Sequence, residues 1–240
     1  MERSNNQTKK LQNYSYFSSC LPFKKTGPEK VFLGRLKNYP KRNRLTKYFD
    51  MKKIIAGVDE VGRGSLVGPV YAAAVILEDR IDKKRLKDSK KLSKKNREIL
   101  NIYIKKNCIW SIGSASIKEI EKYNILNASL LAMNRAIKKL EKKPQLVLVD
   151  GNKLPIIKNY NLKYIVKGDQ KIPEISAASI IAKVSRDLFL SKMAKRFKKY
   201  LWNKNSGYGT KDHIRAIKKF GVTKHHRRTF QPVHKILSLG

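Results

Sequence analysis

From residue 53 onward, runs of apolar residues alternate with stretches in which apolar residues recur every three or four positions. Segments 54–58 and 70–77 are almost wholly apolar and are joined by a glycine-rich turn, which predicts two neighbouring strands. Segment 145–151 is a continuous apolar run closed by an acid and a glycine, as is typical of a strand buried on both faces. Segments 108–115 and 161–167 have the composition of two further strands.

Helix signals lie between these strands. A helix is expected from the N-cap residue Ser93 to about residue 106, and residues 116–119 fit a capping box. A single apolar stripe runs along 127–140, and the small residues within 175–200 suit a long helix packed closely on a sheet. A short helix is expected at 211–220. Because strands and helices alternate without an internal repeat, the pattern predicts an α/β domain with a mixed sheet.

Residues 1–50 differ from the rest of the chain. They are rich in Asn, Ser, Lys and Tyr, contain three prolines, and show no sustained helix or strand period. We expect a basic, disordered extension here, followed by a domain at 51–240 whose portion from about residue 190 is helical. Met51 would be a natural start for that domain, so the alternative is an upstream start codon, with 1–50 absent from the mature protein.

The charge balance points to a polyanionic partner. The 240 residues include 55 Lys and Arg against 18 Asp and Glu, a net charge of +37, which favours nucleic acid ahead of an anionic membrane. No apolar run reaches the roughly 18 residues that a membrane-spanning helix needs. Cys20 and Cys108 match no metal-ligand spacing, and residues 1–50 lack a secretory apolar core. A cytoplasmic location is therefore expected, with an organelle as the alternative.

Acidic residues follow three of the predicted strands. Asp59 and Glu60 follow 54–58, Asp150 closes 145–149, and Asp169 follows 161–167. If these strand ends share one edge of the sheet, four carboxylates meet there, and a bound cation would relieve their repulsion. Oxygen ligands without His or Cys indicate Mg²⁺ or Mn²⁺, and in so basic a protein the substrate would be a phosphodiester. The alternative is a set of turn acids without a shared site.

The two adjacent acids Asp59 and Glu60 can share one metal site only if the strand before them is irregular. Side chains alternate between the faces of an ideal strand, so the strand is expected to end or bulge at this pair if both acids bind one metal site. Gly62 and Gly64 would permit such an irregularity, because glycine adopts backbone conformations that other residues avoid.

Other residues are candidates for contact with the substrate. Backbone amides of Gly62, Arg63 and Gly64 could reach a sugar 2′-hydroxyl, which separates RNA from DNA, although a simple tight turn is the alternative. Tyr208 lies between two glycines and could stack on a sugar or base, or simply pack. Lys90 and Lys183 are candidate phosphate contacts among many lysines. For the histidines we prefer phosphate contact or packing over a role as base or ligand: His213, His225 and His226.

Residues 54–77 resemble the opening motif of the type 2 ribonucleases H, the ribonuclease HII family. The resemblance continues in order from about residue 53 to residue 235. The other matching segments are 88–93, 127–136, 149–151, 167–170, 177–187, 207–210 and 225–233.

This resemblance implies a ribonuclease H-like mixed β-sheet flanked by helices, with a C-terminal helical portion. It implies an endoribonuclease that uses Mn²⁺ or Mg²⁺, with two ions in the reacting complex. Its partners would be RNA–DNA hybrids, in which it hydrolyses the RNA strand, and DNA containing ribonucleotides, which it nicks on the 5′ side of the ribonucleotide. The products carry 3′-hydroxyl and 5′-phosphate ends, which suits ribonucleotide excision repair during DNA replication. We expect a monomer.

The resemblance also implies individual roles. The catalytic, metal-binding acids correspond to Asp59, Glu60, Asp150 and Asp169. The turn that reads the 2′-hydroxyl corresponds to residues 62–64, and the tyrosine that acts with it at the RNA–DNA junction corresponds to Tyr208. Lys90 lies in the family's Asp-Ser-Lys motif, near the substrate backbone.

Asp187 could be mistaken for the fourth acid, but it lies inside a predicted helix, so we expect a structural or supporting role. The chain departs from the family pattern at its first 50 residues, at Tyr200-Leu201-Trp202 in place of Tyr-Gly-Phe, and in stopping soon after Val233. Three alternatives stay open: a non-catalytic basic module, hybrid-only cleavage as in ribonuclease HIII, and a nuclease that cuts DNA alone.

Overall fold

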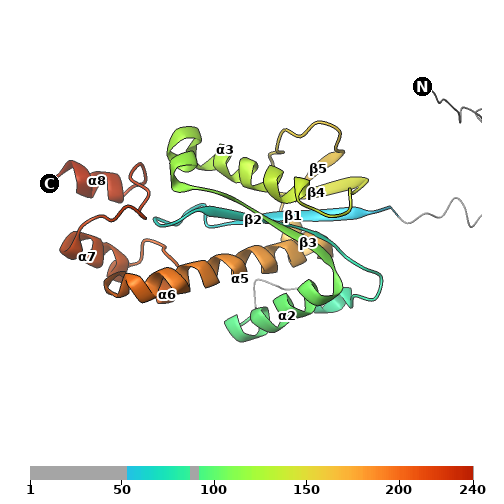
Figure 1. The fold of residues 1–240 in the computed structure, drawn as a ribbon, viewed down its shortest axis with the longest axis horizontal. Coiled ribbons are helices and arrows are strands. Elements are labelled where there is room, and N and C mark those ends of the chain that lie inside the picture. The colour runs from blue at the N-terminus through green and yellow to red at the C-terminus, as the bar shows by residue number, and fades with distance from the viewer. Residues whose placement is uncertain (1–52, 87–91, 240) are drawn as a thin grey trace, which may run out of the picture. The chain divides into compact units, whose positions relative to one another are not determined.

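The computed structural model describes residues 53–86 and 92–239 (Figure 1). Two predictions lie outside the described residues: the character of residues 1–50 and the substrate contact of Lys90. Across the described part of the chain, no helix combines the length and the apolarity that crossing a membrane requires.

Five strands form one mixed sheet, as the sequence predicted, in the spatial order β3-β2-β1-β4-β5. Antiparallel pairing joins β1 to β2 and β2 to β3, whereas β1 to β4 and β4 to β5 are parallel. The strands are β1 (Ile55–Val61), β2 (Val70–Ile76), β3 (Ile109–Ala115), β4 (Leu146–Asp150) and β5 (Leu162–Ile165).

Helices cover both faces of this sheet, which explains why its strands are continuous apolar runs. In Figure 1, α3 (Ile117–Lys138) lies on one side, and α5 (Pro173–Arg196) and α2 (Lys94–Asn107) lie on the other. Ala56 and Val58 of β1 belong to the core beneath α3, and Ala73 and Val75 of β2 to the core beneath α5. Gly57 lets α5 approach closely, since a Cβ there would lie 2.1 Å from the Glu174 carbonyl carbon.

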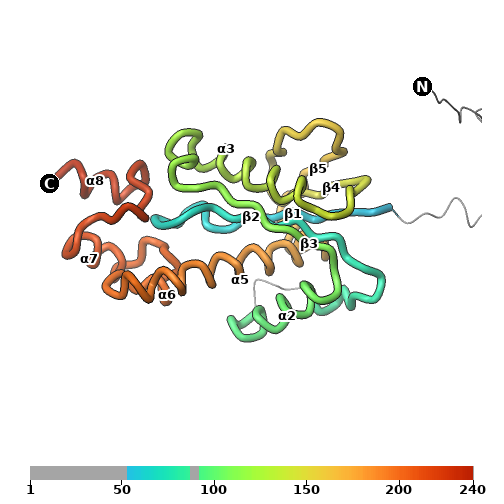
Figure 2. Tube along the Cα trace, viewed as in Figure 1, coloured from blue at the N-terminus to red at the C-terminus, as the bar shows by residue number. Residues whose placement is uncertain are grey.

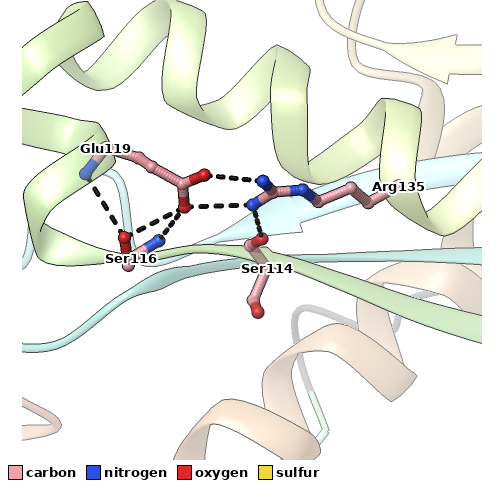
Figure 3. Close-up of polar contacts among 4 residues, drawn as sticks. All are labelled: Ser114, Ser116, Glu119 and Arg135. Atoms are coloured by element: carbon pink, nitrogen blue, oxygen red, sulfur yellow. Dashed lines mark hydrogen bonds and ion pairs between the residues drawn. The ribbon is translucent and has the colours of Figure 1, made fainter.

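The predicted capping box and the predicted helix 127–140 belong to one kinked element, α3. Ser116 caps its start, with both reciprocal bonds to Glu119 present, and Asn124 breaks the helix with a φ of 64°. The Asn124 side chain then accepts a bond from Asn127 N at 3.0 Å, so it caps the second segment. Arg135 of the second segment donates to Glu119 of the first at 2.6 Å and to the Ser114 carbonyl of β3 at 2.7 Å (Figure 3). These bonds hold the kinked helix against the sheet.

Two elements were predicted to extend further than they do. The helix predicted at 175–200 ends at Arg196, where Phe197 leaves helical geometry and its ring packs 5.1 Å from that of Trp202. The strand predicted at 161–167 covers only Leu162–Ile165, because Lys167 adopts a left-handed conformation that starts a short helix, α4 (Gly168–Lys171).

The chain beyond α5 adds a small helical layer. Its elements are η4 (Lys198–Tyr200), α6 (Trp202–Asn205), α7 (Lys211–Phe220) and α8 (Val233–Ser238), and a 3-10 turn, η2 (Lys83–Leu86), lies earlier in the chain. Trp202 and Ile217 are fully buried in this layer. Leu201, at the position where the family pattern has glycine, adopts a left-handed φ of 54°.

The helical layer is tied to the loop between β1 and β2. Figure 2 shows the chain returning after α7 to the end of the sheet near that loop. Leu66 O accepts a bond from Arg227 N at 2.8 Å, and Gly68 N donates to His225 O at 3.0 Å. A short antiparallel bridge joins Val67 to His226. The glycine-rich turn after β1 is therefore supported from the far end of the sequence.

Candidate active site

Four carboxyl groups line one cavity of about 240 Å³. They belong to the four acids singled out in the sequence, which come from three different elements. The cavity is lined by Asp59, Glu60, Val61, Arg97, Asp150, Asp169, Ser179, Ile180, Lys183 and Tyr208.

The parallel pairing of β1 with β4 brings two of these acids together. Val58 lies opposite Val149, so the next residues along, Asp59 and Asp150, are neighbours at the same edge. Asp169 arrives differently from the prediction, because it lies in the first turn of α4 and not at the end of β5. Gly168 N, at the start of α4, donates to Asp150 Oδ1 at 2.7 Å and so fixes α4 against the end of β4.

The expected end or bulge of β1 at the acidic pair was wrong. The strand continues to Val61, with Asp59 opposite Ala73 and Glu60 opposite Ala72, because β2 supplies backbone partners along this whole stretch. Asp59 and Glu60 therefore point to opposite faces of β1, yet both reach the cavity at the edge of the sheet. Among the described residues, no three His, Cys, Asp or Glu side chains are arranged closely enough to hold a metal ion.

The electrostatics of these acids nevertheless suit a cation. Burial raises the pKa of Asp59 well above its usual value, and repulsion from Glu60 and Asp150 adds to this effect, while a hydrogen bond from Ser179 opposes it. Burial also raises the pKa of Glu60, while Arg63, 3.2 Å away, opposes that shift. A buried set of oxygen donors that repel one another matches the ligand preference of a hard divalent ion.

A second, basic cavity adjoins the first. It has a volume of about 440 Å³, and four residues line both cavities: Val61, Arg97, Lys183 and Tyr208. The second cavity is otherwise lined by Lys94, Arg186, Asp187, Ser191, Trp202, Asn203, Lys204 and Ser206. Carboxylates and cationic side chains thus meet along one surface.

Four cationic residues of this surface were not singled out in the sequence: Lys94, Arg97, Arg186 and Lys204. Lys94 and Arg97 lie in the first turn of α2, directly after the N-cap residue Ser93. Nothing in the sequence distinguished them from the other basic residues of this helix, and only the packing of α2 beside α5 brings them to the cavities.

Asp187 lies on α5 and lines the basic cavity, but it does not line the carboxylate cavity. Its Oδ1 accepts a hydrogen bond from Ser206 Oγ at 3.2 Å, and its Oδ2 lies 4.0 Å from Arg97 Nη1. These contacts fit the expected supporting role.

The glycine-rich turn at residues 62–64 follows Glu60 and Val61, which line the carboxylate cavity. The turn itself does not line that cavity. Gly62 has a φ of 92°, and a Cβ there would lie 2.2 Å from Arg186 Nε, so both the backbone conformation and the packing require glycine. A Cβ at Gly64 would lie 3.8 Å from the ring of Tyr208. Arg227 Nη1 donates to the Arg63 carbonyl at 2.9 Å and so supports the turn.

Arg186 links this turn to the loop that carries Tyr208. Its guanidinium donates to Ser65 Oγ at 2.6 Å and to the Ser206 carbonyl at 3.0 Å. The same guanidinium lies 5.9 Å from the centroid of the Tyr208 ring. Tyr208 is 40% exposed, so it has room to meet a ligand.

The histidines pack, as one of the two sequence interpretations had it. His213 and His226 are almost completely buried, and His225 packs edge-on against Phe197. Burial lowers the pKa of all three imidazoles. The alternative interpretation of His213 and His226 as phosphate contacts is wrong, because a buried side chain cannot reach a polyanion at the surface.

A mixed five-stranded sheet between helices, with carboxylates gathered at one edge beside a basic cavity, defines an α/β nuclease of the ribonuclease H-like fold. Comparison with known proteins identifies the family. The sequence pattern of the family described as ribonuclease HII matches residues 56–233, so the chain belongs to the ribonuclease HII family and is a ribonuclease H endonuclease.

Similar proteins agree with this assignment. The chain is 70% identical over 185 residues to a ribonuclease HII of Pelagibacter ubique, covering 77% of this chain and all of the relative. A ribonuclease HII of Neisseria meningitidis is 48% identical over 189 residues, covering 78% of this chain and 97% of the relative. The crystal structure of ribonuclease H2 from Pyrococcus horikoshii superposes with a TM-score of 0.67 at 26% identity, covering 77% of this chain and 97% of the other.

Proposed function

We propose that this ribonuclease H is a metal-dependent endoribonuclease that hydrolyses the RNA strand of RNA–DNA hybrids and nicks duplex DNA 5′ of embedded ribonucleotides. The products would carry 3′-hydroxyl and 5′-phosphate ends. The observation that carries the proposal is that Tyr208 lines the cavity of the four carboxylates, while Arg63 of the 62–64 turn pairs with Glu60. Cutting and recognition of the ribose would then occur on one surface.

Asp59, Glu60, Asp150 and Asp169 would hold the metal ions, Mn²⁺ or Mg²⁺, with two ions in the reacting complex. When bound, the cations supply Lewis-acid activation of the attacking water and charge neutralisation at the leaving oxygen. The proposal is supported by the oxygen-only donor set, by the burial of Asp59 and Glu60, and by the repulsion that Asp150 exerts on both.

The other residues would position the substrate. Lys183 and Arg97 border both cavities and would bind phosphates on either side of the scissile bond. Backbone groups of the 62–64 turn would contact the 2′-hydroxyl, and the Tyr208 ring would pack on the adjacent sugar. Arg63, paired with Glu60, would keep that carboxylate oriented until a cation binds. Such positioning of reacting groups supplies much of the rate enhancement of an enzyme.

The decisive experiment uses a labelled DNA duplex that contains one ribonucleotide, with Mg²⁺, Mn²⁺ or EDTA. We expect a nick on the 5′ side of the ribonucleotide that requires metal and falls by more than about 100-fold in Asp59→Asn. Asp212→Asn, which changes an exposed acid on α7, is the matched control and should cut like the wild type.

The same assay separates the alternatives. Cleavage of an RNA–DNA hybrid without cleavage at the single ribonucleotide would indicate specificity like that of ribonuclease HIII. Cleavage of an all-DNA duplex would indicate a general DNA nuclease. Failure to cut any substrate with either metal would overturn the proposal in favour of a non-catalytic nucleic-acid-binding protein.

A further inference from the structure

The backbone carbonyl of Tyr208 accepts a hydrogen bond from a buried histidine. His213 lies in the first turn of α7, where Thr210 is the N-cap and accepts a bond from His213 N. The His213 ring points back along the chain, and its Nδ1 lies 2.8 Å from the Tyr208 carbonyl oxygen. His213 is fully buried, whereas Tyr208 is 40% exposed. The buried His213 side chain is thus hydrogen-bonded to the backbone of the exposed residue Tyr208.

The partners of His213 determine its tautomer. Trp202 Nε1 lies 3.0 Å from His213 Nε2, and an indole N–H can only donate, so His213 Nε2 must be an unprotonated acceptor. A neutral imidazole with a bare Nε2 carries its proton on Nδ1. That nitrogen faces a carbonyl, which can only accept. Both ends of the ring therefore require the same tautomer, with Nδ1–H donating to Tyr208.

A second buried histidine reinforces this arrangement. His226 Nε2 lies 3.3 Å from His213 Nε2, and its Nδ1 lies 3.0 Å from the backbone nitrogen of Thr223. Because the Thr223 N–H donates to Nδ1, the proton of His226 is on Nε2 and points at His213. The N–H groups of Trp202 and His226 then share the single lone pair of His213 Nε2, and both require the His213 proton on Nδ1, which faces the Tyr208 carbonyl.

The loop that carries Tyr208 depends on such support. Tyr208 stands between two glycines, and Gly207 has a φ of 75°. Tyr208 N donates to Asn205 O and Thr210 N donates to Tyr208 O, both at 2.9 Å, and these two bonds shape the turn. Leu66 N donates to Gly207 O at 2.8 Å and ties the turn to the loop after β1. The bond from His213 anchors the turn to the buried helical layer.

We propose that His213 is a positioning residue for ribose recognition, because its Nδ1–H holds the Tyr208 backbone so that the Tyr208 ring stands at the junction of the two cavities. The inference rests on the proposed function, in which Tyr208 contacts the substrate. His213 touches neither substrate nor metal in this proposal, and its effect passes entirely through Tyr208. His226 and Trp202 fix the tautomer that makes the donation possible.

Three variants test the inference. In His213→Asn, the side-chain NH₂ stands near the place of Nδ1 and can still donate to the Tyr208 carbonyl. In His213→Leu, the apolar volume is kept but no donor remains. Tyr208→Ala removes the group on which His213 is proposed to act. Each is made alone, and His213→Leu is also combined with Tyr208→Ala.

The measurements are kcat and KM for nicking at a single embedded ribonucleotide, together with the midpoint of thermal unfolding. We expect His213→Leu to lower kcat/KM by roughly 10-fold, because small misplacements of a binding group cost about that much or more. His213→Asn should recover most of this loss. In the Tyr208→Ala background, His213→Leu should cause no further loss, since two residues that act through one contact are not additive.

The outcomes distinguish failure of the His213 inference from failure of the proposed substrate contact of Tyr208. Equal fold-losses from His213→Leu with and without Tyr208 would overturn this inference and leave the proposed function intact. A Tyr208→Ala enzyme that cuts like the wild type would overturn both the inference and the proposed substrate contact of Tyr208. If His213→Leu does not fold, the comparison moves to His213→Asn with and without Tyr208→Ala, where loss of more than half the activity in both backgrounds would equally overturn the inference.

Discussion

At the residue scale, buried charge is used here to hold loops. Arg186 and Arg227 are almost completely buried, and the hydrogen bonds that they donate end mainly on backbone carbonyls of the loop after β1. Burial lowers the pKa of the Arg227 guanidinium to about 9. A buried cation without a carboxylate partner is costly, and it is tolerated where its donors satisfy several carbonyls. These two side chains give the 62–64 turn a rigid base.

The buried His226 predicts a pH dependence of stability. Burial, together with the neighbouring His213, lowers its pKa from 6.5 to about 4. The folded state therefore binds fewer protons than the unfolded chain between these values. The stability due to neutral His226 is complete above about pH 6.5 and is lost as the pH falls toward 4, by up to about 3 kcal/mol.

Urea unfolding at a series of pH values measures this effect. His226→Asn should flatten the dependence of the free energy of unfolding on pH across the same window. His234→Asn, which changes an exposed histidine on α8, is the control and should keep the wild-type dependence. An unchanged slope in His226→Asn would contradict the prediction.

At the element scale, the contact between β1 and α5 builds the site. β1 carries Asp59, and α5 carries Ser179 and Lys183, so the distance between these two elements sets how the acids meet the cationic side chains. Glu119 and Arg135 perform a similar structural task on the other face, where their ion pair lowers the pKa of Glu119 to about 2. That pair is partly exposed and contributes only about 1 kcal/mol or less.

Gly57→Ala tests the β1–α5 contact. The added methyl group would lie 2.1 Å from the Glu174 carbonyl carbon, a backbone atom that cannot turn aside, so α5 must move. We expect a loss of about 1–3 kcal/mol in stability and a drop in cleavage activity. Ser114→Ala, on the exposed side of β3, should change stability by less than about 0.5 kcal/mol. Wild-type stability in Gly57→Ala would show that β1 and α5 can separate without cost.

At the scale of the whole molecule, the position of the positive charges matters more for substrate binding than their number. Residues 51–240 hold 43 Lys and Arg against 15 Asp and Glu, or +28. Many of the lysines that the structure describes are exposed. Such a charge attracts any polyanion without regard to sequence. The cations that border both cavities, Arg97 and Lys183, differ from the rest because they stand next to the carboxylates.

This placement predicts which lysines and arginines bind substrate phosphates. In an Asp59→Asn background, which prevents cutting, Lys183→Gln or Arg97→Gln should weaken binding of an RNA–DNA hybrid. Each change should also reduce the slope of log K against log salt by about 1. Lys142→Gln is the matched control, because Lys142 lines a separate cavity near the start of β1. Equal effects of all three changes would mean that binding depends on net charge alone.

The sequence by itself predicted the five strands and the main helices in their order, and it singled out the four acids that line one cavity. Periodicity and capping residues are local signals, so the capping box at Ser116 and the strands before Asp59 and Asp150 could be predicted directly. The family resemblance added the roles expected of those acids, because motifs spread along the chain identify a family even where no single one suffices. Boundaries such as the end of α5 were less accurate, since packing of Phe197 on Trp202 decides them.

Only the tertiary structure decided how distant residues meet. β1 continues past Asp59 because β2 pairs with it, Asp169 arrives on α4 and not on a strand, and Arg97 reaches the cavities because α2 packs beside α5. The bond from His213 to the Tyr208 carbonyl depends on a loop and a helix start that no periodicity encodes. These arrangements depend on long-range pairing and packing, whereas propensity and period describe only a few neighbouring residues.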